Sequence, residues 1–407
     1  MSVTDVDVVV VGAGQAGLSI SRVLSELGRE HLVLERGQVG QSWRDRWDSF
    51  TLVLPNWTVR LAGQAYDGPD PDGFMPRDEF VEYLNSYAAS GGAPVRGGVE
   101  ALALGRWDGR FALETSAGEF RAREVVVATG GYQRPHRPAG VRELEALLPV
   151  IEAGQYRSPG QLPSGRVLVV GSGQSGCQIA EELHRDGREV VLSCGRAPGG
   201  PRRIGGRDIF WWVAESRFMR MTLEDLPNPM ARIAPNPQSS GLRGGHDLHY
   251  RTLQAIGVIL VGHLLGARAG WLEFAADLAD SVDFGDARYR DLQKLVAEMA
   301  AERGLPVPSL PEPAPFHADA PGRLEAAAFG AVVCTSGFRP DYTRWIDFPE
   351  AFDETGFPIQ NQGSSTKVPG LHFMGVPFQR SRASATLYGV GHDAEVLGAS
   401  LATAAGA

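Results

Sequence analysis

Two apolar runs along the chain share one pattern of hydrophobic and polar positions. Residues 6–11 are rich in valine and residues 166–170 read RVLVV, which is typical of buried parallel strands. Each run ends in glycines spaced G-x-G-x-x-G, and a segment with apolar residues at helical spacing follows. A further strand is expected in each unit, at 31–35 and at 188–196. The pattern therefore predicts two strand–turn–helix–strand units in one chain.

The first glycine turn has the spacing of a dinucleotide site. Gly12 allows the turn, Gly14 lets the backbone approach a pyrophosphate, and Gly17 lets helix and strand pack closely. Glu35 lies 18 residues past Gly17, where a carboxylate can accept both ribose hydroxyls and repel a 2′-phosphate. This turn is expected to hold FAD or NAD, not NADP; the alternative is a glycine-rich turn without a ligand.

The second turn repeats the first but ends without a carboxylate. Its glycines are Gly171, Gly173 and Gly176. The following strand ends at Ser193 and continues to Arg196, whose guanidinium can grip a 2′-phosphate through two parallel hydrogen bonds. We therefore predict NADPH at this turn. Arg202 and Arg203 either share this task or are solvated loop charges. Two different dinucleotides in one chain imply that NADPH passes a hydride to a flavin.

Composition and charge narrow the function classes. A chain of 407 residues with 43% hydrophobic and 21% charged residues is globular and long enough for two domains. Its net charge of −9 argues against nucleic acid as a partner. The chain begins without a signal-peptide pattern, and its longest apolar stretch, 256–266, is too short for a membrane span, so we expect a cytoplasmic enzyme. The three cysteines form no C-x-x-C pair, which weakens a disulfide-reductase function.

Several motifs together resemble class B flavin-dependent monooxygenases, and more closely their bacterial oxidoreductase branch. The motifs are GAGQAG with its following glutamate, GQSW at 40–43, VVVATGG at 125–131, VVGSGQSG at 169–176 and CTSGFRPD at 334–341. This superfamily includes flavin-containing monooxygenases, YUCCA-type enzymes and Baeyer–Villiger monooxygenases. The resemblance covers nearly the whole chain. It implies an α/β fold of two Rossmann-like domains, with the NADPH domain inserted in the FAD domain.

The resemblance also implies domain boundaries and site residues. The FAD domain is expected at 1–155 and 325–407, and the NADPH domain at 156–324 with a partly helical cap at about 205–315. Asn56, in LVLPNW, is the candidate catalytic residue, the alternative being a plain turn residue. Further cofactor contacts are expected from Gln15, Ala16, Arg36, Ser42, Trp43, Ala128, Thr129, Gly130, Gln174, Ser175, Gly391 and Asp393. Candidate substrate contacts are Trp57, Trp211 and Trp212, with packing of the cap as the alternative.

One fingerprint of the family is incomplete. Just before the second glycine turn, Tyr156 is kept, but Glu152 stands where the family has a histidine. This argues against the Baeyer–Villiger subclass and leaves open how tightly NADP⁺ is held. His246 and His249 flank Asp247 without the spacing of a metal site, so we expect a polar loop and no metal.

The predicted reaction is oxygenation by a flavin. NADPH would reduce FAD, O₂ would form a C4a-peroxyflavin, and a small lipophilic or aromatic substrate would take oxygen at nitrogen or sulfur. The alternatives are an NADPH-dependent flavoprotein reductase or dehydrogenase that inserts no oxygen, and a non-enzymatic flavoprotein that serves a partner. A homodimer is compatible with the sequence.

Overall fold

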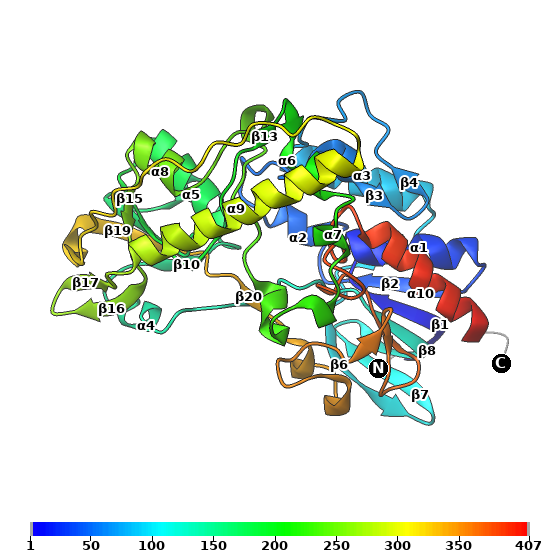
Figure 1. The fold of residues 1–407 in the computed structure, drawn as a ribbon. Helices are drawn as coiled ribbons and strands as arrows, with labels where there is room; N and C mark the ends of the chain where they lie inside the picture. Colours follow the sequence, from blue (N-terminus) through cyan, green and yellow to red (C-terminus); the bar gives the residue numbers. More distant parts are fainter. Residues whose placement is uncertain (1–2, 405–407) are drawn as a thin grey trace.

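The computed structural model describes residues 3–404, and its two largest sheets are each covered by helices (Figure 1). The first has nine strands, of which seven follow one path and two form an antiparallel branch at one of its strands. Its main order is β21 (Gln360–Asn361), β22 (Ser364–Ser365), β23 (Leu371–Phe373), β8 (Gly118–Val127), β1 (Val3–Val11), β2 (His31–Glu35) and β5 (Val95–Gly97). The branch adds β6 (Ala101–Trp107) and β7 (Arg110–Thr115).

The centre of this first sheet is parallel, and the chain passes through helices between β1 and β2 and between β2 and β5. β1 pairs in parallel with β2 and β8, and β23 joins β8 from the far end of the chain. The valines of β1 alternate between two apolar layers, so both faces of the sheet are buried. On one face α1 packs against α10 and α3. Their bounds are α1 (Gln15–Glu26), α3 (Arg77–Ser90) and α10 (Val390–Ala404).

The second sheet is parallel throughout. Its order is β10 (Val150–Glu152), β19 (Phe329–Cys334), β11 (Arg166–Val170), β12 (Val190–Ser193) and β15 (Ile259–Val261). Helix α5 (Gln174–Arg185) follows β11, as α1 follows β1. The expected fold class, α/β with two Rossmann-like units, is confirmed. The second sheet extends beyond the expected 156–324 at both ends, because β10 and β19 belong to it.

The two sheets are joined where the chain crosses between them. β9 (Arg134–Pro135) lies on the outgoing segment and β20 (Phe338–Arg339) on the returning one, and the two pair antiparallel. The short elements nearby are α2 (Gln41–Arg44), β3 (Arg60–Leu61), β4 (Gln64–Ala65) and α4 (Val141–Leu144).

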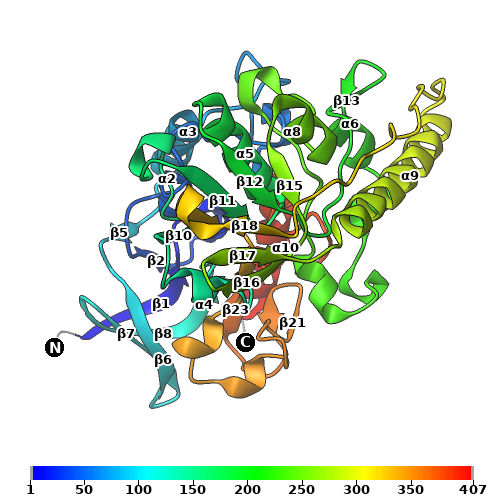
Figure 2. The same cartoon turned by 90° about the vertical axis from the view of Figure 1, so that its left-hand side faces the viewer.

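The segment expected to form a cap is only partly separate from the second sheet. β15 and α8 (Tyr250–Ile256) lie within the expected 205–315 yet pack into the second sheet. Near its end this segment forms one long helix, α9, which runs along the molecule from β17 toward α6 (Figures 1 and 2). The elements are β13 (Arg203–Ile204), β14 (Arg207–Asp208), α6 (Ile209–Val213), α7 (Arg217–Arg220), β16 (Leu264–Arg268), β17 (Trp271–Phe274), α9 (Leu278–Glu302) and β18 (Arg323–Glu325).

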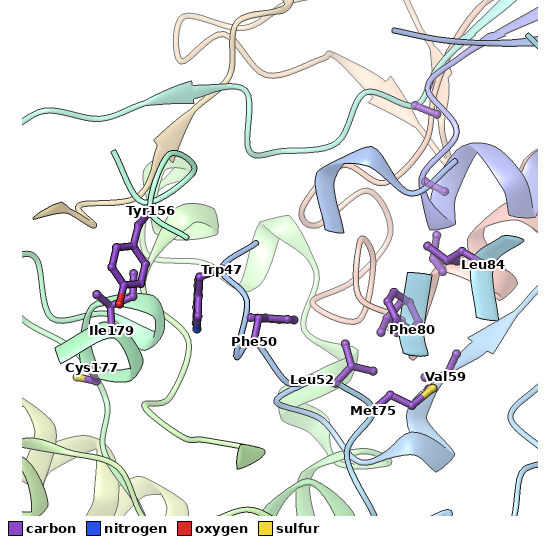
Figure 3. Close-up of a cluster of buried hydrophobic side chains, with 14 of the residues drawn as sticks. Trp47, Phe50, Leu52, Val59, Met75, Phe80, Leu84, Tyr156, Cys177 and Ile179 are labelled. Atoms are coloured by element: carbon purple, nitrogen blue, oxygen red, sulfur yellow. The ribbon is translucent and has the colours of Figure 1, made fainter. Parts of the chain in front are cut away.

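One continuous apolar core connects both dinucleotide units. Figure 3 shows Tyr156 and Ile179 of the second unit on one side of Trp47 and Phe50, and Phe80 of the first unit on the other. Trp47 and Phe50 meet edge to face with ring centroids 5.1 Å apart. The segment after α2 therefore fills the joint between the two units, and fixes how they face each other.

Candidate dinucleotide sites and the cavity between them

The first glycine turn is built by close backbone approaches that only glycine permits. Gly12 has φ +110°, and a Cβ there would lie 2.6 Å from the carbonyl oxygen of Ala128 at the end of β8. A Cβ on Gly17 would lie 1.8 Å from the carbonyl oxygen of Gly12. The first and third glycines therefore serve the packing of strand against helix.

The middle glycine of each turn faces open space instead. A Cβ on Gly14 or Gly173 would meet no protein atom within 4 Å. Each is the N-cap of a twelve-residue helix, α1 or α5, whose N-terminus has no side-chain cap. The free N–H groups of these first turns are therefore available to a phosphate, and the missing Cβ leaves room for it.

Glu35 is held in place by the first turn. Its Oε2 accepts a hydrogen bond from the backbone N–H of Ala13 at 2.9 Å, and its Oε1 accepts one from Gly37 at 2.9 Å. The carboxylate is buried but lines the cavity. Because an ionised carboxylate has about four acceptor positions, it can still accept hydroxyl groups from a ribose.

The second turn is braced by β19 and α8. Gly171 has φ +103°, and a Cβ there would lie 2.9 Å from the backbone of Thr335, whose hydroxyl donates to the Gly171 carbonyl at 2.6 Å. The Ser172 hydroxyl shares a 2.6 Å hydrogen bond with Tyr250 and accepts one from the Gly195 N–H at 2.8 Å. This network fixes the backbone directly before Arg196.

Arg196 lines the cavity as an exposed guanidinium, and among residues 3–404 no hydrogen bond or ion pair engages its side chain. Ser193 is different, since its hydroxyl donates to Gly262 at 3.0 Å and accepts from the Leu264 N–H at 3.0 Å. The side-chain donor of Ser193 is therefore already used within the protein.

His263 is a candidate that the sequence did not indicate. It follows β15 and lines the cavity, and a Cβ on Gly195 would lie 3.1 Å from its Nε2. Its Nδ1 lies 2.6 Å from an oxygen of Asp277, which leaves Nε2 free for a ligand. No motif marks this histidine, because its neighbours in space come from separate strands.

A single cavity of about 2010 Å³ connects both turns. It exceeds the roughly 300–1,000 Å³ of a pocket for one small ligand. The predicted cofactor contacts that line it are Gly12, Gly14, Gln15, Ala16, Glu35, Arg36, Ser42, Trp43, Ala128, Thr129, Gly130, Gly171, Gly173, Gln174, Ser175, Ser193 and Arg196. Gly17 and Gly176 lie behind the turns, and a Cβ on Gly176 would lie 1.9 Å from the Gly171 carbonyl oxygen.

The lining of the cavity is electropositive although the chain is acidic. Eleven arginines and six carboxylates line it, an excess of five positive charges in a chain of net charge −9. Clustered charge of one sign in a recess concentrates ligands of the opposite sign. The cavity therefore suits the phosphates of two dinucleotides.

Asn56, the candidate catalytic residue, does not line this cavity. Its Nδ2 donates to the carbonyl of Asp70 at 2.9 Å, and its Oδ1 accepts from the N–H of Met75 at 2.8 Å. The buried amide holds a neighbouring loop, so the structure places Asn56 in a structural position.

The three predicted tryptophan contacts also lie behind the cavity wall. Trp57 packs against Phe210 with ring centroids 5.8 Å apart. Trp212 donates its indole N–H to Ile204 at 2.9 Å, and Trp211 stacks on Arg303. Within the same short helix α6, the residues that do line the cavity are Ile209, Phe210 and Val213.

The start of α10 does not line the cavity either. A Cβ on Gly391 would lie 2.6 Å from the carbonyl oxygen of Arg60, so this glycine serves helix packing. Asp393 is buried and pairs with Arg380 at 3.3 Å, and burial raises the pKa of its carboxyl. The residues just before this helix, 384–387, line the cavity in its place.

Arg202 and Glu152, which the sequence analysis also singled out, each form an ion pair within the protein. Arg202 is buried against Asp208 at 2.6 Å, and Arg203 is exposed outside the cavity lining. Glu152 lines the cavity and forms an ion pair with Arg137.

His246 and His249 have different hydrogen-bond partners. His246 Nε2 is 2.8 Å from Glu181, and His249 caps α8. The described part of the chain holds no group of three or more potential metal-ligating side chains.

Comparisons with known proteins agree with this geometry. Residues 9–202 match the family model described as pyridine nucleotide-disulphide oxidoreductase. The chain is 33% identical over 395 residues to the CzcO-like oxidoreductase of Geobacillus kaustophilus, covering 96% of this chain and 97% of that protein. It is 33% identical over 191 residues to the indole-3-pyruvate monooxygenase YUCCA1 of Oryza sativa, covering 45% and 46%. A flavin-containing monooxygenase from Stenotrophomonas maltophilia superposes with a TM-score of 0.68 at 20% identity, covering 99% and 100%.

The two glycine turns, together with Glu35, Arg196 and this fold, define an oxidoreductase that uses FAD and NADPH, and its fold is the one found in flavin-containing monooxygenases. Glu35 and the Gly12–Gly17 turn would hold FAD, and Arg196 with the Gly171–Gly176 turn would hold NADPH. The chain belongs to the family of CzcO-like oxidoreductases. No helix within residues 3–404 is both long enough and apolar enough to cross a membrane.

Proposed function

We propose that this enzyme is a monooxygenase that uses NADPH, FAD and O₂ to oxygenate a small lipophilic or aromatic substrate, at nitrogen or sulfur. One observation carries the proposal: the cavity that joins the two dinucleotide turns continues along apolar side chains of α6 and α7, among them Phe210, Val213 and Phe218. A recess of this kind has room for a substrate beside two dinucleotides.

The protein's own residues would bind and orient the two dinucleotides and the substrate, and would keep water out of the site. When bound, FAD supplies the redox chemistry and the reaction with O₂. The common core around Trp47 fixes the two cradles against each other, which a hydride transfer at contact distance requires. Phe210, Val213 and Phe218 line the cavity with apolar surface and so exclude water from the reacting groups.

The reductase alternative is weakest for a disulfide substrate. Cys177, Cys194 and Cys334 are free and buried. Burial raises the pKa of all three thiols, that of Cys334 to about 12. A thiol with a raised pKa is a poor nucleophile, so these cysteines are unsuited to disulfide exchange.

Rapid mixing of the NADPH-reduced enzyme with oxygenated buffer tests the proposal. We expect a transient absorbance that belongs to neither oxidised nor reduced flavin, and its decay should accelerate when substrate is added. NADPH consumption should match the product formed. Immediate return of oxidised flavin, with peroxide equal to the NADPH consumed, would favour the reductase alternative. A cytoplasmic location and a homodimer stay predictions from the sequence.

A further inference from the structure

Arg382 is a cavity-lining cation for which the protein offers no anion. No hydrogen bond or ion pair engages its side chain among residues 3–404, and its Nε–H is buried without a partner. Arg380, two residues earlier, is paired with Asp393 at 3.3 Å. Buried donors are normally satisfied, so the unpartnered Nε–H of Arg382 requires an explanation.

Two aromatic rings hold this guanidinium in position. Its central carbon lies 4.2 Å from the ring centroid of Phe218 in α7 and 5.0 Å from that of Phe378. The backbone N–H of Arg382 donates to the carbonyl of Met221 at 2.8 Å, which ties this segment to the one after α7. A guanidinium that contacts two rings is restricted before a ligand binds, so less conformational freedom is lost on binding.

The backbone around Arg382 is strained at two positions. Phe378 has φ +58° and Ala385 has φ +67°, and both line the cavity. Left-handed conformations are unfavourable for residues with a side chain, most of all for a bulky one, and they cluster at functional sites. Phe378 is therefore both strained and in contact with the guanidinium.

The surroundings of Arg382 are apolar. Phe210, Val213 and Met219 line the cavity and belong to one apolar cluster or pack against it, and Leu387 of the larger core also lines the cavity. Burial lowers the pKa of Arg382, and no nearby carboxylate opposes that effect. Since arginine keeps its charge in proteins, the guanidinium remains a partly buried cation beside apolar side chains.

We propose that Arg382 binds the carboxylate of the substrate, so that the substrate is a small aromatic or alkyl carboxylic acid. The two parallel N–H groups of a guanidinium match the two oxygens of a carboxylate, and the apolar wall would receive the rest of the molecule. The inference rests on the proposed function only in identifying this ligand with the substrate. The binding itself requires neither NADPH nor O₂.

Calorimetric titration of the oxidised FAD-loaded enzyme tests this proposal. The probes are phenylacetate, 3-phenylpropanoate and 4-phenylbutanoate, each compared with its neutral amide of the same shape. We expect the wild type to bind at least one acid about tenfold or more tightly than its amide. In Arg382→Gln the affinity for that acid should fall about 10- to 100-fold, since a hydrogen bond to a charged group is worth that much, while amide affinity changes less than about threefold.

Two further variants keep the test independent of folding. Arg382→Lys retains the charge without the two-pronged geometry, and should recover part of the affinity for the acid. Arg344→Gln removes another cavity arginine, whose side chain is 81% exposed, and should leave acid binding unchanged. Flavin content and affinity for NADP⁺ are measured on every variant.

Three results would overturn the proposal: no acid binds the wild type, Arg382→Gln weakens acids and amides equally, or the variant loses FAD or NADP⁺ and keeps acid binding. The last result would make Arg382 a cofactor ligand. If acids bind selectively but rapid mixing of the NADPH-reduced enzyme with O₂ returns oxidised flavin at once, the proposed function fails and the carboxylate site stands.

Discussion

Replacing Arg196 by alanine should change which nicotinamide cofactor the enzyme prefers. The side chain is exposed at the cavity and unpaired within residues 3–404, so its removal breaks no contact inside the protein. NADPH carries a 2′-phosphate that can accept two hydrogen bonds from a guanidinium, whereas NADH has only a hydroxyl there. The substitution should therefore weaken the binding of NADPH much more than that of NADH.

The expected increase in KM for NADPH depends on how exposed Arg196 is. A hydrogen bond to a charged group contributes about 1.5–3 kcal/mol, and solvent screening at an exposed site reduces what two such bonds add together. We take one bond's contribution, which corresponds to about a 10- to 100-fold increase in KM for NADPH. For NADH we expect a change below about threefold. High salt should weaken NADPH binding more in the wild type than in Arg196→Ala.

Steady-state NADPH and NADH oxidation by the FAD-loaded enzyme measures both values. Arg203→Ala is the matched control, because Arg203 is exposed in the same domain but does not line the cavity. An unchanged ratio of the two KM values in Arg196→Ala would refute the assignment. Equal losses in both arginine variants would show a general charge effect rather than a specific contact.

Two further predictions concern flavin uptake and stability. Gly14→Val should fold normally but purify without flavin, since its side chain enters the space left for a phosphate; Gly17→Ala should instead destabilise the fold, because its Cβ would lie 1.8 Å from a carbonyl oxygen. A fully yellow Gly14→Val protein with wild-type stability would contradict this. The hydrogen bond to Glu181 raises the pKa of His246 in the folded protein. Protonated His246 therefore stabilises the folded state fully below about pH 6.5, and this contribution to the free energy of unfolding is lost as the pH rises through the raised pKa. Urea midpoints should fall from pH 6 to pH 9 more steeply in the wild type than in His246→Gln, and parallel slopes would be evidence against this pair.

The sequence predicted the two cradles because their geometry is local. Gly12, Gly17 and Glu35 are fixed by a strand, a turn and a helix that follow one another, so spacing alone specifies their positions. The same holds for Gly171 and Gly176 in the second unit.

The walls of the cavity could not be predicted in this way. Residues 209–212 are all apolar, so their pattern does not distinguish a side that faces the cavity from a side that packs in the core. In the structure Trp212 packs against α9, whereas Phe210 lines the cavity. Arg382 gave no signal because Phe218, which stacks on it, comes from a distant part of the chain. Asn56 is a catalytic candidate only by resemblance to the family. The hydrogen bonds of its amide reach residues 70 and 75, contacts that the local sequence does not reveal.

The shared core explains why both cradles can serve one reaction. A hydride passes only between groups at contact distance, so two independently mobile nucleotide domains would seldom hold their ligands correctly. Here Trp47 and Phe50 pack between Tyr156 of one unit and Phe80 of the other, in one buried cluster (Figure 3). The chain crosses between the sheets through the paired strands β9 and β20, next to cavity-lining residues such as Gln133 and Phe338. The cavity is therefore bounded by segments that the apolar core and the paired crossing strands hold together, and its shape depends on the whole chain rather than on either unit alone.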